Sequence, residues 1–281
     1  MKHNLEKVKV AFNSGHGEIL LDYFNQRVKI INFTGRAEDM LEALFEYVKT
    51  KDIDKVFFIS PYNNLENFLS LGFLKEATID GFFRGDAGYY LSKYLSGNRM
   101  ESESVLKEDE IILVSLDNTN KLPDQALEDG FTIRDAVSAD AEEMANLYQT
   151  VFKSYPTPMN DPSYIIKSMG KGTYYKIIIY KDNIIGAASA DLDKDNLNAE
   201  ITDCATLPEY RGRGIMTILI SELEKLLASK EIITSYTIAR AISLGMNIVF
   251  AKLGYNYTGR LINNCHIGGQ FEDMNVWVKK V

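Results

Sequence analysis

The sequence has few of the residues that build disulfide frameworks and metal sites. Its 281 residues include two cysteines, Cys204 and Cys265, and three histidines, His3, His16 and His266. Two cysteines cannot staple a chain of this length, and its first residues do not read as a secretory signal, so we expect a reduced, cytoplasmic protein. The histidines lack the spacing of a zinc site, and we expect no metal.

Long hydrophobic runs and an excess of basic charge are missing as well. No apolar stretch approaches the roughly 20 residues of a membrane helix, so we expect no membrane contact. Lys and Arg number 31 against 39 Asp and Glu, a net charge of -8 at pH 7. This balance argues against nucleic acid, which needs a concentrated basic face. It suits a cationic substrate such as a small amine.

The length fits two compact domains rather than one. The stretch 96–130 is polar and turn-rich, interrupted by EIILVSL at 110–116, for which we expect a strand. We place the domain boundary here, with an N-terminal domain at 1–125 and a C-terminal domain at 126–281.

Hydrophobic periodicity predicts an α+β fold in both halves. In the first half we expect strands at 27–33, 55–60, 78–83 and 88–94 and helices at 37–48 and 63–71. In the second we expect strands at 131–134, 174–180, 184–191, 199–206 and 233–239. Its helices are expected at 139–152, capped by Ser138, at 163–169, at 215–227 and before Leu253. KVFFIS, a helix, LGF and two strands parallel SYTIA, a helix, LGY and two strands, which indicates an internal repeat.

The segment 199–227 carries most of the functional information. A strand leads to Leu207, and Arg211-Gly212-Arg213-Gly214 turns the chain into a helix. Such a helix start offers unpaired backbone N–H groups and the positive end of the helix dipole, which suit a pyrophosphate. The glycines admit close approach of the backbone, and the arginines add charge. A surface turn with two solvated arginines is the alternative, and the first repeat has only a short acidic turn at 34–39.

With these residues the sequence resembles the GNAT superfamily of N-acetyltransferases. The signature Arg/Gln-x-x-Gly-x-Gly/Ala is met by Arg211 and Gly214 and departs at Met216, while LPEY (207–210) and FAKLGY (250–255) are also typical. The resemblance implies a mixed central sheet flanked by helices, here preceded by a smaller degenerate GNAT-like domain, and acetyl-CoA as co-substrate. It implies that the pantetheine arm pairs with backbone at Ala205, Thr206 and Leu207. The pyrophosphate is implied at Arg211, Gly212, Arg213, Gly214, Ile215, Met216 and Thr217.

The whole chain is similar to a narrower group, the β-lysine N6-acetyltransferases. The similarity rests on the length, SYPTP (154–158), ARAISLGMN (239–247) and NNCHIGGQFEDMNVWVK (263–279). It implies acetylation of the terminal amine of (3S)-3,6-diaminohexanoate, which gives a compatible solute for osmoadaptation. The alternatives are another small amine, a peptide N-terminus, or a CoA-binding sensor without turnover.

An amine must lose a proton to become a nucleophile, since alkylammonium groups have a pKa near 10.4. Glu200 is our first candidate base because AEITDCAT resembles the strand of GNAT histone acetyltransferases whose glutamate has this role. Asp203 is the second candidate. Strand alternation places them on opposite faces, so only one should face the acetyl group unless a β-bulge intervenes. A solvated edge carboxylate is the alternative for Glu200.

The thiolate usually receives its proton from a tyrosine at the position of Phe250, so that acid is absent here. For Tyr255 we favour core packing, and for Cys204 a small buried residue rather than an acyl carrier. The oxyanion is expected at the backbone N–H of Ala205 or Thr206.

Other polar residues are weaker candidates. Ser243 and Asn247 on the late helix are expected at the cofactor, with helix-surface roles equally open. Tyr155 is expected to wall the acceptor pocket, and Asn264 and His266 to bind a diamine. We slightly favour a charged hairpin turn for Glu272 and Asp273. Arg240 or Arg260 would pair with a substrate carboxylate or form an ordinary surface salt bridge.

We therefore expect a direct transfer of the acetyl group within a ternary complex. The first domain is expected to bury a sheet edge, to form a homodimer contact, or to shape the acceptor pocket.

Overall fold

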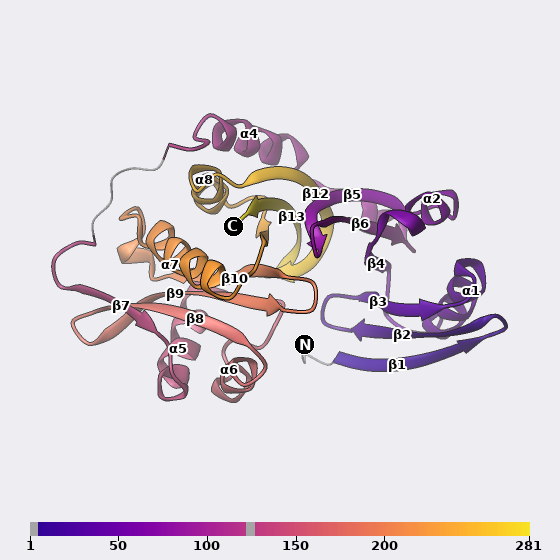
Figure 1. Cartoon of the computed structure of the whole chain (residues 1–281), viewed down its shortest axis with the longest axis horizontal. Coiled ribbons are helices and arrows are strands. Elements are labelled where there is room, and N and C mark those ends of the chain that lie inside the picture. Colours follow the sequence, from indigo (N-terminus) through magenta and orange to yellow (C-terminus); the bar gives the residue numbers. More distant parts are fainter. Residues whose placement is uncertain (1–4, 122–126) are drawn as a thin grey trace.

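The computed structural model describes residues 5–121 and 127–281, and their strands form one mixed sheet (Figure 1). The strand order is β1-β2-β3-β4-β6-β5-β12-β13-β11-β10-β9-β8-β7. The strands of the first half are β1 (Leu5–Phe12), β2 (Gly15–Asp22), β3 (Arg27–Thr34), β4 (Lys55–Ser60), β5 (Leu74–Phe83) and β6 (Asp86–Tyr94). Those of the second half are β7 (Phe131–Asp135), β8 (Thr173–Tyr180), β9 (Asn183–Asp193), β10 (Asn198–Thr206), β11 (Thr234–Arg240), β12 (Asn256–Ile267) and β13 (Gln270–Lys280).

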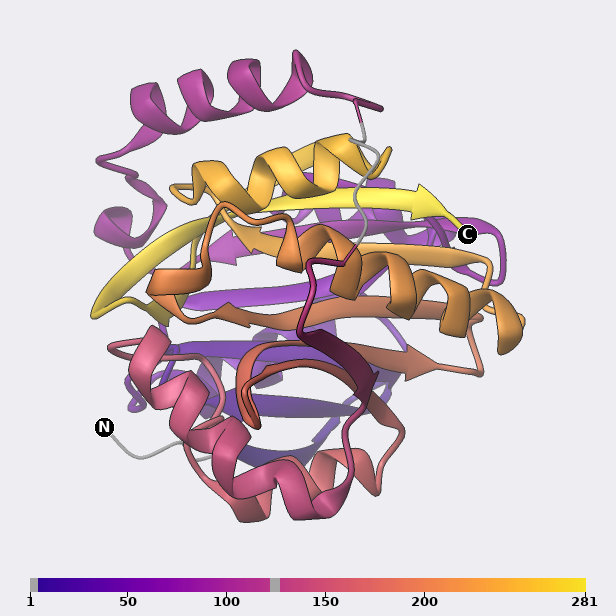
Figure 2. The ribbon, with the colours of Figure 1, turned by 90° about the vertical axis from the view of Figure 1, so that its left-hand side faces the viewer.

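Helices cover both faces of the second half of this sheet, with α7 and α8 on one side and α5 and α6 on the other (Figures 1 and 2). In this part of the chain they are α5 (Ala141–Val151), α6 (Pro162–Met169), α7 (Ile215–Ser229) and α8 (Leu244–Lys252). In the first half they are α1 (Ala37–Val48), α2 (Tyr62–Ser70), α3 (Gly97–Met100) and α4 (Val105–Leu116). No helix in the described residues is both long and apolar enough to cross a membrane. The expected α+β fold with a mixed sheet flanked by helices is confirmed.

Two local predictions are wrong. Residues 110–116 lie in helix α4 rather than in a strand, with Ile111, Ile112 and Ser115 buried on one side. A short run of β-branched residues fits either element, and packing of this helix against α8 decides the outcome. Ser138 is not a cap but begins a 3-10 turn, in which the Asp140 carboxylate accepts a hydrogen bond from the backbone N–H of Val137 at 2.8 Å.

The predicted internal repeat is visible in the topology. The order β3-β4-β6-β5 in the first half matches β10-β11-β13-β12 in the second, with α1 and α7 in equivalent connections. In each copy the parallel pair is short: residues 27–29 pair with 55–57, and residues 198–200 pair with 234–236. The same unit is therefore used twice.

The two copies share one sheet and one apolar cluster. β5 pairs with β12 through Ala77 and Gly259, where a Cβ on the glycine would collide with the backbone oxygen of Glu76. Phe57, Ile79 and Tyr90 of the first copy pack in one cluster with residues of the second: Tyr236, Leu261, Cys265, Ile267, Met274, Val276 and Val278. The first copy therefore completes the core of the second.

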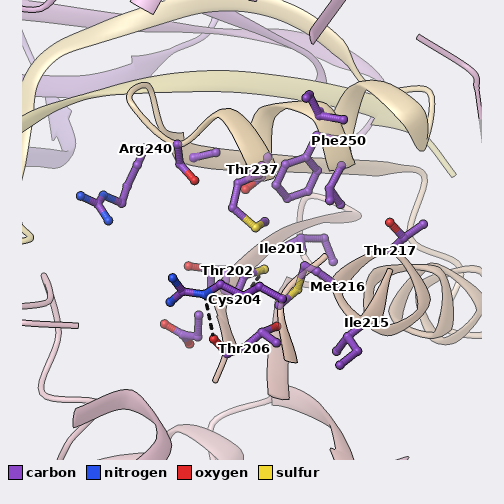
Figure 3. Close-up of a pocket in the computed structure, with 18 of the residues that line it drawn as sticks. Ile201, Thr202, Cys204, Thr206, Ile215, Met216, Thr217, Thr237, Arg240 and Phe250 are labelled. Atoms are coloured by element: carbon purple, nitrogen blue, oxygen red, sulfur yellow. Dashed lines mark hydrogen bonds between the residues drawn. The ribbon is translucent and has the colours of Figure 1, made fainter. Parts of the chain in front are cut away.

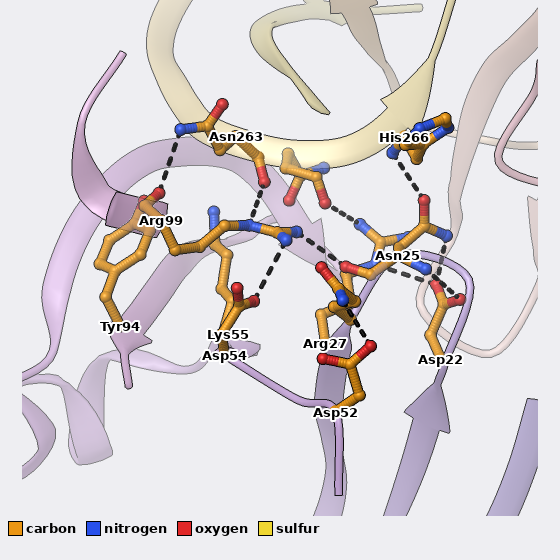
Figure 4. A network of polar contacts seen from close by, with 12 residues as sticks. Asp22, Asn25, Arg27, Asp52, Asp54, Lys55, Tyr94, Arg99, Asn263 and His266 are labelled. Atoms are coloured by element: carbon orange, nitrogen blue, oxygen red, sulfur yellow. Dashed lines mark hydrogen bonds and ion pairs between the residues drawn. The ribbon is translucent and has the colours of Figure 1, made fainter. Parts of the chain in front are cut away.

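Buried charges also cross this contact (Figure 4). Arg99 pairs with Asp54 at 3.1 Å and donates from Nε to the backbone oxygen of Asn263 at 2.8 Å. The Lys55 ammonium is fully buried, pairs with Glu76 at 3.0 Å and donates to the backbone oxygen of Ile262 at 2.8 Å. Removing one partner of such a pair leaves an uncompensated buried charge, so this contact fixes the relative position of the copies.

A second buried group of charges holds α4 against the end of the sheet. Glu108 on α4 and Asp273 on β13 are both 2% exposed, and among the described residues Glu108 Oε2 and Asp273 Oδ2 have no hydrogen-bond partner. Arg260 Nη1 lies 3.6 Å from Glu108 Oε2. Burial and the neighbouring Asp273 raise the pKa of Glu108 to about 8. Burial beside Asp273 therefore favours the neutral form of Glu108 in the folded protein.

This pair predicts a pH-dependent stability. An unfolded glutamate titrates near 4.3, so folding becomes less favourable as the pH rises from about 4.3 to about 8, and the effect levels off above that. Glu108→Gln mimics the protonated form. We expect it to melt near wild type at pH 5 and several degrees higher at pH 8.5, at about 2–4 °C per kcal/mol. Thermal unfolding at both pH values measures this, with Glu110→Gln on the exposed side of α4 as control. Equal shifts at both pH values would contradict the assignment.

Candidate active site

The candidate site is a cavity that opens where β10 and β11 diverge (Figure 3). The two strands pair only through residues 198–200 and 234–236. Beyond these residues both strands line a cavity of about 620 Å³, together with the turn before α7 and the start of α8. The opening therefore exposes strand backbone and side chains between two helices.

The turn into α7 forms one end of this cavity. Gly212 and Gly214 adopt left-handed φ values of 79° and 71°, which favour glycine. Gly214 is the N-cap residue and supplies no side-chain cap, so the first N–H groups of the helix have no side-chain acceptor. With the positive end of the helix dipole, these groups are a candidate anion site beside the cavity.

Eight of the predicted cofactor residues line the cavity: Thr206, Arg211, Gly212, Gly214, Ile215, Met216, Thr217 and Ser243. Arg211 also donates from Nε to the backbone oxygen of Thr206 at 3.2 Å, which ties the turn to the end of β10. Arg213 is not part of the lining. It points outward, pairs with Glu128 at 3.1 Å and lies over the Tyr210 ring.

Three other predicted cofactor residues also stand apart from the cavity lining. Ala205 is buried in the core beneath α5, and the backbone N–H of Leu207 already donates to Ile185 at 2.9 Å. Asn247 is fully buried: its amide donates to the backbone oxygen of Ser243 at 2.8 Å, and its side-chain oxygen accepts from Trp277 at 2.9 Å. These hydrogen bonds fix the β11–α8 loop, and Asn247 is not among the residues that line the cavity.

In the first copy, groups of the protein itself occupy the equivalent turn. The backbone N–H of Arg36, just before α1, donates to Ser14 Oγ at 2.9 Å, and the Arg36 guanidinium pairs with Asp39. A Cβ on Gly35 would lie 2.6 Å from the backbone oxygen of Ser14. An anion would meet the acidic Asp39 there, so this turn does not repeat the anion site of the second copy.

A β-bulge interrupts β10 beside the cavity. The register with β9 shifts between Thr202 and Ala205, and Asp203 has a left-handed φ of 49°. Asp203 Oδ2 accepts from Ser189 Oγ at 2.8 Å, and Ser189 opposes Thr202, which lies two residues from Glu200. The bulge therefore brings Asp203 and Glu200 to the same face of the sheet, which ideal alternation would not do.

The two carboxylates have different surroundings on that face. Asp203 lines the cavity, and burial raises its pKa to about 6 while Ser189, Tyr155 and Tyr175 lower it. Glu200 is not among the lining residues. Burial, followed by the charge of Asp191, raises its pKa to about 7, and the Tyr236 hydroxyl donates to it at 3.4 Å. Asp203 is thus the carboxylate in direct contact with the cavity.

Comparison with known proteins agrees with this geometry. A model described as the Acetyltransferase (GNAT) family matches residues 141–255. N-acetyltransferase YodP of Bacillus subtilis (strain 168) is 36% identical over 260 residues, 92% of this chain and 94% of that protein. Beta-lysine N(6)-acetyltransferases of Methanosarcina mazei and Methanococcus maripaludis are 37% and 34% identical, covering 89% and 93% of this chain and 99% and 95% of their own. The chain belongs to the GNAT acetyltransferase family.

Near the position expected for the CoA thiol, Phe250 stands in place of the proton-donating tyrosine, and Tyr255 lies beside it. Phe250 lines the cavity and packs edge-on against Tyr255, with ring centroids 5.1 Å apart. The Tyr255 hydroxyl is buried and hydrogen-bonds with Ser235 Oγ at 2.7 Å, in agreement with a role in the core. Cys204 is partly buried in the cavity wall, and burial raises the pKa of its thiol, which disfavours the thiolate.

The predicted substrate residues separate into two groups. Tyr155 lines the cavity and packs on Phe152, with ring centroids 4.6 Å apart. Asn264 and His266 lie in the contact between the two copies of the GNAT unit and not in the cavity lining, and Figure 4 shows His266 beside Asn25. Asn264 accepts from the Tyr90 hydroxyl at 3.1 Å, and the backbone N–H of His266 donates to Asn25 Oδ1 at 2.8 Å.

Several residues of the site were missed or misread from the sequence. Tyr148, Tyr175 and Ser189 surround Asp203, yet they come from three separate elements with no local motif. Glu272 and Asp273 are buried in β13, and the hairpin turn is formed by Gly268 and Gly269 instead. Only the pairing of distant strands reveals these positions.

The glycine turn predicts how this GNAT enzyme responds to CoA. Gly214→Glu would force a side chain into a left-handed position and place a carboxylate at the anion site. We expect the apparent affinity for CoA, measured by a thermal-shift titration, to fall at least tenfold. Gly97→Glu is the control because a Cβ there meets nothing within 4 Å. Unchanged CoA stabilisation in Gly214→Glu would show that the ligand sits elsewhere.

Proposed function

We propose that this enzyme transfers the acetyl group of acetyl-CoA to the terminal amine of β-lysine. The observation that carries the proposal is Asp203, a buried carboxylate presented by a β-bulge in a cavity that leads to an uncapped helix start. Support for the acceptor comes from the two relatives named beta-lysine N(6)-acetyltransferase, which match nearly the full chain. The product would serve as a compatible solute.

The residues present fit acetyl-CoA as a substrate. Its pyrophosphate would meet the backbone N–H groups of 215–217 and the Arg211 side chain. The pantetheine arm would lie between the diverging ends of β10 and β11, against apolar side chains of α8 such as Met246 and Val249. This places the acetyl group deeper in the cavity, toward the bulge.

The reaction requires one proton acceptor and one leaving group. The terminal ammonium first loses one proton to solvent; the neutral amine nitrogen then forms a bond with the acetyl carbon, the carbon–sulfur bond breaks, and the second proton passes to the Asp203 carboxylate. With a pKa of about 6, Asp203 is mostly ionised at neutral pH and can accept that proton. CoA leaves as a thiolate, which is a fair leaving group because free thiols have a pKa near 8.5.

Direct transfer in a ternary complex fits better than an acetyl-enzyme. An acetyl-enzyme needs a nucleophilic side chain, and Cys204 is the side chain best suited to carry the acetyl group. Burial raises the pKa of its thiol. A thiol held in its neutral form is a poor nucleophile. The amine therefore attacks the acetyl group of acetyl-CoA itself.

We also propose that the first domain, residues 1–125, supports the acceptor side of the site. Its residues share the apolar cluster that contains Ile267 and Met274, which both line the cavity. Burial lowers the pKa of Lys29 on β3, and the charges of Glu200, Asp193 and Asp191 act against that shift. The degenerate copy thus packs behind the cavity wall and adds charge rather than chemistry.

Release of free thiol from acetyl-CoA tests the function. We expect turnover with β-lysine to exceed that with α-lysine and spermidine, measured in parallel as acceptor-dependent thiol release. Turnover on another amine alone would replace β-lysine as the acceptor. CoA stabilisation without thiol release on any of the three would contradict this proposal and favour the sensor.

The choice of base predicts a contrast between two variants. We expect Asp203→Asn to lower kcat by about 10²–10⁴-fold while CoA stabilisation persists, because the amine proton loses its acceptor. Glu200→Gln should lower it less than tenfold. In wild type the rate should rise as the pH passes about 6, where Asp203 ionises. A larger loss in Glu200→Gln than in Asp203→Asn across the pH range would assign the base to Glu200.

A further inference from the structure

Arg240 is the last residue of β11 and lines the cavity on the side where the acceptor amine would approach Asp203. Tyr236 contacts Glu200, so the regular alternation of β11 places Arg240, four residues on, on the face that carries Glu200 and Asp203. Arg240 lines the cavity with its side chain 31% exposed (Figure 3). Arg211 and Lys252 are the other basic residues in the described lining, and they lie in the turn before α7 and at the end of α8.

Glu272 fixes the orientation of this guanidinium. Arg240 Nε donates to one Glu272 oxygen at 2.7 Å and Nη2 donates to the other at 2.6 Å, a bidentate pair. Glu272 is nearly buried, whereas the arginine side chain keeps its exposure in the cavity. Among the described residues no hydrogen bond involves Nη1, so two N–H donors remain for a ligand.

The wall that accompanies Arg240 and Asp203 is apolar. Ile238, Met274, Ile267 and Phe152 line the same cavity as the two charged groups. Arg240, Asp203 and this aliphatic wall together suit a molecule with a carboxylate, an amine and a chain of methylene groups. Arg240, Glu272 and ionised Asp203 sum to a charge of about -1, which complements an acceptor with two ammonium groups and one carboxylate.

We propose that Arg240 binds the carboxylate of the acceptor through Nη1 and thereby makes the enzyme selective for amino acids with a terminal amine over simple diamines. This inference rests on the proposed acetyltransferase function. Glu272 acts as a positioning residue, because it holds the guanidinium without meeting the substrate. Binding at Arg240 leaves the terminal amine of the acceptor to reach Asp203 and the acetyl group.

The test compares two acceptors that differ by the carboxylate, β-lysine and 1,4-diaminopentane. In wild type we expect kcat/KM to favour β-lysine by about 10–100-fold, the range of a hydrogen bond to a charged group. Arg240→Gln should raise the KM for β-lysine by about that factor and leave the KM for 1,4-diaminopentane unchanged. Glu272→Gln should raise the KM for β-lysine by a smaller factor, with kcat near wild type.

Controls separate this inference from the function itself. Arg134→Gln removes an exposed arginine that pairs with Asp140, far along the chain from β11, and should keep the wild-type preference. An equal loss on both acceptors in Arg240→Gln, with CoA stabilisation intact, would overturn the carboxylate role, as would an unchanged KM for β-lysine. Absence of turnover by wild type on either acceptor would instead refute the proposed function. Should Arg240→Gln fail to fold, the Glu272→Gln comparison decides the same question.

Discussion

β10 and β11 share hydrogen bonds over only three residue pairs, and the site depends on their divergence after that point. Parallel strands that stayed paired would bury the backbone where a ligand must enter. Their separation opens the cavity, and α7 and α8 hold the two strand ends apart from the same side of the sheet. The bulge at Asp203 then turns a carboxylate toward the opening.

Duplication of this arrangement explains the division of labour in the chain. Both copies have the short parallel pair, yet only the second has the glycine turn that we propose as the anion site, within the described residues. In the first copy Ser14 Oγ, in the β1–β2 turn, accepts a hydrogen bond from the backbone N–H of Arg36. Asp39 adds a negative charge there. The first copy instead supplies β5 to the edge of β12 and aromatic side chains to the shared core.

Ionisable groups are buried both in the contact between the two halves and at the candidate site. Lys55 with Glu76, Glu108 with Asp273 and Arg240 with Glu272 each link elements distant in sequence. Desolvated charges of this kind contribute less to the free energy of folding than to fixing one arrangement. In the cavity the same physics raises the pKa of Asp203 toward the range that a base needs.

The sequence by itself determined the local elements and the glycine turn. Helix α1 and strand β4 have the predicted bounds, because α1 shows a clear helical hydrophobic period and β4 is a short run of consecutive apolar residues. Gly212 and Gly214 were identified because left-handed backbone leaves a local sequence signal. The helix at 110–116 was not, since a short β-branched run packs equally well in either element until a neighbour is present.

Tertiary structure alone decided which side chains meet. The shared face of Glu200 and Asp203 follows from a bulge that the strand pattern does not show, and the Ser189, Tyr148 and Tyr175 partners of Asp203 come from three elements. Asn264 and His266 were predicted to bind a substrate, and in the structure they contact Tyr90 of β6 and Asn25 of the β2–β3 turn in the first copy. Arg240 and Glu272 lie 32 residues apart and meet through the β11–β13 register. Periodicity reports each segment's own preferences, whereas contacts between segments depend on register and packing that no single segment contains.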